Sequence, residues 1–189
     1  MGKRNTNKRP EWKIIVGLGN PDEKYTQTYH NAGWLSIEII AAGLPKKADS
    51  RKNGLFLYRK TNGAVLVKSL TYMNESGKAV TAAIKYFSGK ENRIRPENIL
   101  VIHDDSDISI GEYKISFGRG SAGHKGAQSI INRLGTKNFW RFRVGIRKGP
   151  KLKAGAFVLR KMTVADRQTI RKTIEKFGRE YGLFLDFKA

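Results

Sequence analysis

The sequence predicts a single three-layer α/β/α domain with a mixed, mostly parallel central sheet. The first observation is that short apolar runs, typical of buried strands, alternate along the chain with segments whose apolar residues recur at helical spacing. The second is the length of 189 residues, which suits one domain with a sizeable core. The third is the absence of an internal repeat. We expect residues 1–12 to form a flexible basic arm and residues 13–189 to form the domain.

The first half of the chain predicts a strand, a helix and a hairpin. Residues 14–16 are an apolar run that ends in a Gly-Leu-Gly-Asn-Pro turn, as a buried strand does. A helix follows and stops near Gly43, with apolar positions at Ala32, Leu35, Ile39 and Ile40. Residues 46–53 are expected to form a polar loop. The runs 55–60 and 64–69 flank Thr-Asn-Gly, a strong signal for a hairpin.

The second half alternates helices and strands. A helix is predicted after Asn74, which is also a candidate N-cap, with apolar positions at Ala79, Val80, Ala83, Ile84 and Phe87. A buried strand is predicted at 99–102, and strands with alternating apolar and polar residues are predicted at 112–117 and 139–147. A helix is predicted between the last two, with apolar positions at Ala127, Ile130, Ile131 and Leu134. The spacing Thr163-x-x-Asp166 resembles a capping box that opens a final helix, with Ile170, Ile174 and Phe177 buried.

The charge of the chain indicates a polyanionic partner. There are 37 Lys and Arg against 16 Asp and Glu, a formal net charge of +21. A basic surface that serves only solubility is the alternative. The chain has no cysteine, which excludes disulfides and thiolate metal sites. No apolar run approaches the length of a membrane span, and the basic N-terminus lacks the apolar core of a secretory signal.

Polar residues stand at several predicted strand ends and turns. Asn20 follows the first strand, where α/β sheets tend to place their sites. His30 precedes the first helix, where it is either a base or a structural histidine at a helix start. Asp104, Asp105 and Asp107 follow the strand at 99–102, and such carboxylates must be solvated, paired or metal-bound. No calcium-loop spacing supports a Mg²⁺ or Ca²⁺ site.

Two glycine patterns invite a dinucleotide interpretation that the sequence does not sustain. The turn after the first strand has Asp22 at the third glycine position of the motif. Residues 118–123 match G-x-G-x-x-G, but no acid stands about 20 positions further on, where the motif requires one. The second pattern still predicts a turn of backbone N–H groups ahead of a helix, which suits a phosphate or a developing oxyanion. The arginines that alternate along 139–147 suggest phosphate contacts or an ordinary solvated edge.

The available groups favour hydrolysis by an activated water. The chain has no G-x-S-x-G elbow and no cysteine nucleophile. His30 is the candidate base, and Asp104 is the candidate carboxylate that holds the far ring nitrogen and keeps the imidazole basic. Side-chain amides would hold the acyl group and its oxyanion.

At these residues the sequence closely resembles the bacterial-type peptidyl-tRNA hydrolase family. The resemblance runs from about residue 12 to 180 and rests on six motifs in the family's order: Val-Gly-Leu-Gly-Asn-Pro (16–21), Tyr25 through His-Asn-Ala-Gly (30–33), Tyr-Met-Asn-x-Ser-Gly-Lys (72–78), His-Asp-x-x-Asp (103–107), Gly-His-Lys-Gly (123–126) and Phe-x-Arg-x-Arg-x-Gly-Ile (139–146). It implies hydrolysis of the ester between a peptide and the 3′ end of a tRNA.

The resemblance also implies the role of each matching residue. His30 would be the general base, Asp104 would support it, and Asn20 would contact the peptide end. The cleft for the peptide and the terminal nucleotide would be lined by Tyr25, Tyr72, Met73, Asn74 and Lys125. Lys114 and Arg143 match positions associated with tRNA phosphates. The family further implies a cytoplasmic monomer that needs no metal or other cofactor.

Three departures from the family pattern carry an alternative. Lys125 stands where the family has an asparagine that binds substrate, and Tyr29 stands where a basic residue is usual. The chain also ends soon after Leu183, which predicts a shorter C-terminal lid region. Lys125 and the excess charge motivate the alternative of a non-catalytic RNA-binding relative, of the kind recruited to RNA splicing. The retained His30 and Asp104 argue against it, since a binding protein needs neither.

Overall fold

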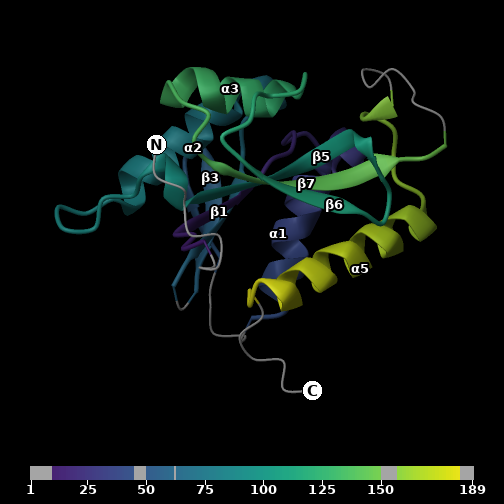
Figure 1. Cartoon of the computed structure of the whole chain (residues 1–189), viewed down its shortest axis with the longest axis horizontal. Coiled ribbons are helices and arrows are strands. Elements are labelled where there is room, and N and C mark those ends of the chain that lie inside the picture. Colours follow the sequence, from purple (N-terminus) through teal and green to yellow (C-terminus); the bar gives the residue numbers. More distant parts are fainter. Residues whose placement is uncertain (1–9, 45–49, 62, 150–156, 184–189) are drawn as a thin grey trace.

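The computed structural model describes residues 10–44, 50–61, 63–149 and 157–183 (Figure 1). The strands are β1 (Ile14–Gly17), β2 (Arg51–Asn53), β3 (Phe56–Lys60), β4 (Val65–Ser69), β5 (Ile99–Ser109), β6 (Tyr113–Phe117) and β7 (Trp140–Arg147). The α-helices are α1 (Ala32–Ala42), α2 (Ser76–Phe87), α3 (Lys125–Leu134) and α5 (Val164–Glu180). Single 3₁₀ turns are η1 (Glu23–Tyr25), η2 (Tyr29–Asn31), η3 (Met73–Glu75) and η4 (Pro96–Asn98).

The strands form one mixed sheet in the order β2-β3-β4-β1-β5-β7-β6. The central pairings of β4 with β1, β1 with β5 and β5 with β7 are parallel. The outer pairings are antiparallel, and they include the predicted hairpin of β3 and β4. The predicted α/β class with a mixed sheet is confirmed.

Helices cover both faces of the sheet, with α1 and α5 on one face and α2 and α3 on the other (Figure 1). Side chains alternate along each strand, so β1 sends Ile15 toward the first pair of helices and Ile14 and Val16 toward the second. Trp12 is already part of the core, where its ring stacks on Tyr181. Residues 1–9 of the predicted arm lie outside the described residues.

Two predicted boundaries are wrong. Residues 51–53 form β2 rather than part of a polar loop, because they pair with β3 along the edge of the sheet. The strand predicted at 99–102 continues to Ser109, so His103 to Asp107 lie within β5. Pairing with β7 carries the strand on, with a register irregularity between Asp105 and Ser109. The polar side chains are tolerated there because several of them find partners.

Asn74 and Arg141 also differ from expectation. Asn74 is not the N-cap of α2, since it lies inside η3 and Glu75 precedes the helix. Arg141 lies on the face opposite Phe142 as predicted, but it is 2% exposed rather than solvated. Its Nη2 donates to the carbonyl oxygen of Gly120 at 2.6 Å, so the glycine turn after β6 lies against this side chain. The predicted N-cap of α5 is confirmed, with Thr163 Oγ1 accepting from the Asp166 N–H.

Helix α1 meets the sheet at a contact between two backbones. A Cβ atom added to Gly17 would lie 2.2 Å from the carbonyl oxygen of Gly33, and one added to Gly33 would lie 2.4 Å from that of Ile102. Neither position has room for a side chain, because backbone atoms have no way to swing aside. The start of α1 is therefore fixed against the end of β1 and against Ile102 in β5, and His30 lies three residues before Gly33.

Candidate active site

A cleft of about 470 Å³ opens beyond the end of β1 and the start of α1. Eight residues predicted to form the site line this cleft: Asn20, Tyr25, His30, Tyr72, Met73, Asn74, Asp104 and Lys125. They come from six separate segments of the chain, and the fold brings all of them together. The lining also includes groups that the sequence analysis did not assign to the site: Asp105, Ser106, Asp107, Ala122, Gly123, His124, Val158 and Leu159.

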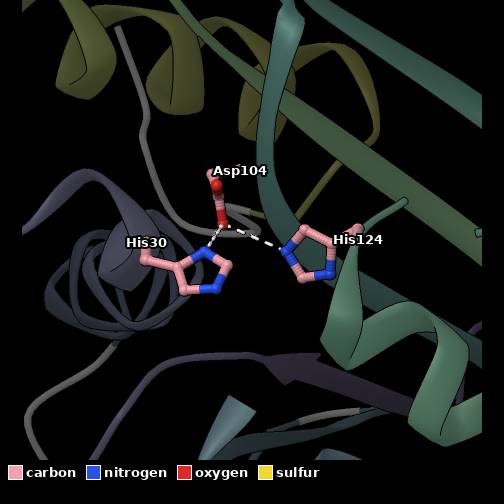
Figure 2. A group of neighbouring side chains, drawn as sticks. All are labelled: His30, Asp104 and His124. Carbon is pink, nitrogen blue, oxygen red and sulfur yellow. Dashed lines mark hydrogen bonds and ion pairs between the residues drawn. The ribbon is translucent and has the colours of Figure 1, made fainter. Parts of the chain in front are cut away.

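Two histidines converge on one carboxylate oxygen (Figure 2). His30 Nδ1 lies 2.8 Å from Asp104 Oδ1, and His124 Nε2 lies 3.1 Å from the same oxygen. The three side chains come from η2, from β5 and from the residue before α3. Asp104 is 2% exposed, so its charge is stabilised by these two contacts rather than by bulk water.

The proton positions follow from the cap of α3. His124 is the N-cap of this helix, and its Nδ1 accepts a hydrogen bond from the Ala127 N–H at 3.1 Å. Because Nδ1 is an acceptor, neutral His124 carries its proton on Nε2 and donates it to Asp104. Because the Asp104 carboxylate accepts hydrogen bonds, His30 Nδ1 must also carry a proton. His30 Nε2 is then unprotonated and has a free lone pair. The network therefore fixes the tautomer that a general base needs.

Asp104 stays ionised in this arrangement. Burial acts to raise its pKa, but the attraction of His30 and His124 and their hydrogen bonds outweigh burial and hold the pKa well below its usual range. A third histidine, His103, lies behind the site with its ring centroid 4.2 Å from that of His124. Burial, followed by the proximity of His124, lowers the pKa of His103 well below its ordinary value, so His103 is neutral.

Asn20 is held by three hydrogen bonds. Its backbone N–H donates to Asn31 Oδ1 at 2.8 Å, and its carbonyl oxygen accepts from Asn31 Nδ2 at 3.1 Å. Its side-chain oxygen accepts from the Met73 N–H at 2.8 Å. These contacts tie the turn after β1 to η2 and η3. Since the amide oxygen faces Met73, the amide NH₂ is the group that Asn20 offers to the cleft.

The glycine turn predicted at 118–123 is present and delivers His124 to the site. Gly118, Ala122 and Gly123 all have positive φ, at 65°, 51° and 81°. For Ala122 this conformation is strained, and such strain is often found at functional sites. The buried Arg141 holds the turn through the Gly120 carbonyl.

Lys114 and Arg143 do not line the cleft. They are paired in register on β6 and β7, and β7 in turn pairs with β5. Arg143 is half-buried, and its Nε and Nη2 each lie 2.7 Å from Asp105 Oδ2. Lys114 is exposed. The pair therefore lies on a strand surface next to the site rather than inside it.

The cluster of His30, Asp104 and His124 also has the donor types of a metal site, with the ligand atoms within 4.8 Å of one another. A metal on His124 Nε2 would move the ring proton to Nδ1, where it would oppose the Ala127 N–H. The residues fit a hydrogen-bond network better than they fit a metal ion.

Similarity to known proteins agrees with this geometry. The family model for peptidyl-tRNA hydrolase matches residues 14–188. The chain belongs to the peptidyl-tRNA hydrolase family. It is 38% identical over 168 residues to a peptidyl-tRNA hydrolase of Mycobacterium tuberculosis, which covers 86% of this chain and 85% of that protein. It is 40% identical over 168 residues to the one of Thermodesulfovibrio yellowstonii, covering 86% and 87%.

Solved structures of the peptidyl-tRNA hydrolase family share the fold. The enzyme of Acinetobacter baumannii superposes with a TM-score of 0.80 at 30% identity, over 95% of this chain and 91% of that one. The family resemblance predicted from the six motifs is confirmed, and the chain is a member of a hydrolase family. In the described part of the chain, no helix has the length and apolar character needed to cross a membrane.

His124 is the main residue that sequence reasoning missed. It was present in the Gly-His-Lys-Gly motif, but it was given no role. A signal did exist, because it stands immediately before a clean helical pattern, where an N-cap with a hydrogen-bond acceptor is expected. Its second bond, to Asp104, joins residues 20 positions apart and could not be found from spacing.

Proposed function

We propose that this protein hydrolyses the ester bond between a peptide, or an N-blocked aminoacyl group, and the 3′ end of a tRNA, and so returns the tRNA to translation. The observation that carries the proposal is the pair of histidines on Asp104, which leaves a lone pair on His30 Nε2 beside a cleft of about 470 Å³. Membership of the peptidyl-tRNA hydrolase family supports the same reaction.

The reaction proceeds through an activated water. His30 Nε2 removes a proton from water, and the resulting oxygen attacks the ester carbonyl carbon to form a tetrahedral intermediate. The intermediate collapses by breaking the bond between this carbon and the ribose oxygen, and the imidazolium returns the proton to that oxygen. Asp104 stabilises the imidazolium in between, and no covalent enzyme intermediate is required.

The remaining residues of the cleft bind the substrate. The NH₂ of Asn20 contacts the peptide end and helps to distinguish blocked from free aminoacyl groups. The aromatic and apolar side chains of Tyr25, Tyr72 and Met73 pack against the terminal nucleotide and the peptide, and Asn74 and Lys125 supply polar contacts. Tyr72 is 46% exposed, as suits a side chain that a ligand covers.

The tRNA contacts extend beyond the cleft onto β6 and β7. Lys114 and Arg143 lie beside each other there, and we assign them to phosphates of the acceptor end. Arg143 keeps Asp105 as a partner, so it offers its remaining N–H groups in a fixed direction. The net charge of +21 favours such a polyanion. We further propose that the protein acts in the cytoplasm as a monomer, with residues 13–189 as one catalytic domain and a basic arm before it. Trp12, which was expected in the arm, belongs to the core of the domain instead.

Release of peptide from an N-blocked aminoacyl-tRNA under single-turnover conditions tests the proposal. Wild type should release the peptide, and His30→Ala should abolish release while tRNA affinity stays within a few-fold. Lys125→Asn, measured in parallel, separates the alternative. A wild type that binds tRNA tightly without releasing peptide, together with an active Lys125→Asn variant, would identify an RNA-binding relative instead.

A further inference from the structure

The turn that carries His30 is tied to a segment far away in the sequence. The His30 N–H donates to the carbonyl oxygen of Val158 at 2.8 Å, and the neighbouring Tyr29 N–H donates to that of Arg160 at 3.2 Å. The Met162 N–H in turn donates to the carbonyl oxygen of Gln27 at 2.8 Å. Because Val158 and Leu159 line the cleft, this pairing joins the base to one wall of its own site.

The side chain of Tyr29 anchors the same turn to the start of α5. Its hydroxyl donates to Asp166 Oδ2 at 2.5 Å, and its ring stacks on Phe157 with centroids 4.6 Å apart. Asp166 is 5% exposed, and it also accepts from the Thr163 hydroxyl at 2.6 Å and from Lys148 Nζ at 3.0 Å. The carboxylate is therefore held in place independently of Tyr29 and offers Tyr29 a fixed charged acceptor.

The pKa shifts of Tyr29 and Asp166 are consistent with a strong hydrogen bond between the two side chains. Burial raises the pKa of the Tyr29 hydroxyl, and the hydrogen bond to Asp166 raises it further. Burial acts to raise the pKa of Asp166, but its bonds to Thr163, Tyr29 and Lys148 prevail and lower it. A protonated donor thus faces an ionised acceptor across the neutral pH range.

We propose that Tyr29, through Asp166, is a positioning residue for the general base. Tyr29 and His30 are adjacent in η2, so a shift of the Tyr29 backbone moves His30 relative to Asp104 and to Val158. The inference rests on the proposed hydrolase function. Tyr29 does not line the cleft and touches no reacting atom, so its effect passes through the orientation of His30.

The other end of α5 provides a matched control. There the hydroxyl of Tyr113, on β6, donates to Glu180 in the last turn of the helix. Both contacts join a tyrosine to a carboxylate of the same helix, and burial raises the pKa of Tyr113 as it does that of Tyr29. Only Tyr29 is adjacent to the base. Each Tyr→Phe substitution removes a single hydroxyl and keeps the ring packing.

The test compares single-turnover peptide release by wild type, Tyr29→Phe and Tyr113→Phe, with thermal unfolding measured for each. Tyr29→Phe should lower the rate constant about tenfold, leave the half-saturating enzyme concentration within about twofold, and move the acid limb of the pH–rate profile to lower pH. The limb moves because Asp104 stabilises the His30 imidazolium less once His30 has shifted away from it. Tyr113→Phe should retain the wild-type rate and pH profile.

The inference would be overturned if Tyr29→Phe and Tyr113→Phe had the same rate constant and the same pH profile, whether both matched wild type or both were slower. Asp166→Asn should lower the rate as well, and the double variant Tyr29→Phe/Asp166→Asn should be no slower than the slower single variant. If Tyr29→Phe does not fold, Lys148→Gln removes another partner of the Asp166 carboxylate. This variant should lower the rate constant of peptide release by less than about tenfold. An inactive wild type would refute the hydrolase proposal itself, which is a separate result.

Discussion

Replacing Asp104 by asparagine separates the charge of the carboxylate from its geometry. Both histidines contact the same oxygen, Oδ1, at 2.8 and 3.1 Å. An asparagine with its amide oxygen at this place keeps both hydrogen bonds and both tautomers. What it removes is the negative charge that faces the imidazolium during the reaction, so the two histidines keep their orientation and lose their electrostatic partner.

The size of the effect follows from the short contact between Asp104 and His30. At an effective dielectric constant of about 20, unit charges about 4 Å apart attract each other by about 4 kcal/mol. The remaining neutral hydrogen bond retains about 1 kcal/mol of this. A loss of about 3 kcal/mol in the transition state corresponds to a decrease in rate of about 100-fold. Asp104→Ala, which removes the oxygen as well, should be slower still.

The assay is single-turnover peptide release, with tRNA affinity measured on the same variants. Asp105→Asn is the control, because Asp105 is the adjacent carboxylate in the same cleft but its partner is Arg143. Asp105→Asn should change tRNA affinity more than the rate constant, because Asp105 orients Arg143 and does not contact either histidine of the Asp104 network. An Asp104→Asn rate within about threefold of wild type would refute the electrostatic argument. Equal rates for Asp104→Asn and Asp104→Ala would refute the retained geometry.

The same substitution has a signature in stability. The pKa of Asp104 is depressed in the folded protein, so its contribution to the free energy of unfolding is present above the ordinary aspartate pKa. This contribution is lost as the pH falls toward the folded-state pKa. Asp104→Asn should therefore be less stable than wild type at neutral pH, and the difference between their free energies of unfolding should narrow below about pH 4.

Two further predictions concern the helix cap and the tRNA interface. His124→Asn and His124→Ala should both lower the rate of peptide release and the free energy of unfolding, because both remove the contact with Asp104. His124→Ala should be less stable than His124→Asn by about 1 kcal/mol, because asparagine is a good N-cap and alanine is not. Equal stabilities for the two variants would contradict the cap assignment. The logarithm of tRNA affinity should fall linearly with the logarithm of salt concentration, and Lys114→Ala should reduce the slope by about one; a flat dependence would exclude an interface dominated by phosphates.

The sequence predicted the sheet class from local patterns, and it predicted most of the cleft from the resemblance of six motifs to one family. Apolar runs bounded by glycine and proline identified β1 and the hairpin of β3 and β4. Asn20 was expected at a site because it follows the first strand, where α/β sheets tend to place their sites. All eight residues predicted for the catalytic and substrate-binding site do line one cleft.

The rest depended on contacts between distant residues. β5 runs past its apolar stretch because β7 pairs with it, and Arg143 neutralises one of the carboxylates there. Alternation alone suggests that Arg141 is a surface arginine, but the side chain is buried and binds the carbonyl oxygen of Gly120 in the glycine turn. The bond from Tyr29 to Asp166 spans 137 residues, and no spacing rule indicates it.

The contact of Gly17 with Gly33 makes the protein sensitive to substitution at a place that contains no reactive group. The start of α1, and with it the proposed general base His30, is placed by a close approach of two backbones. A single added methyl group carries no charge and accepts no proton, yet at either glycine it would force the helix away from the sheet. A change that inactivates this protein therefore need not touch the reacting groups, because added volume where α1 meets β1 is enough to displace His30.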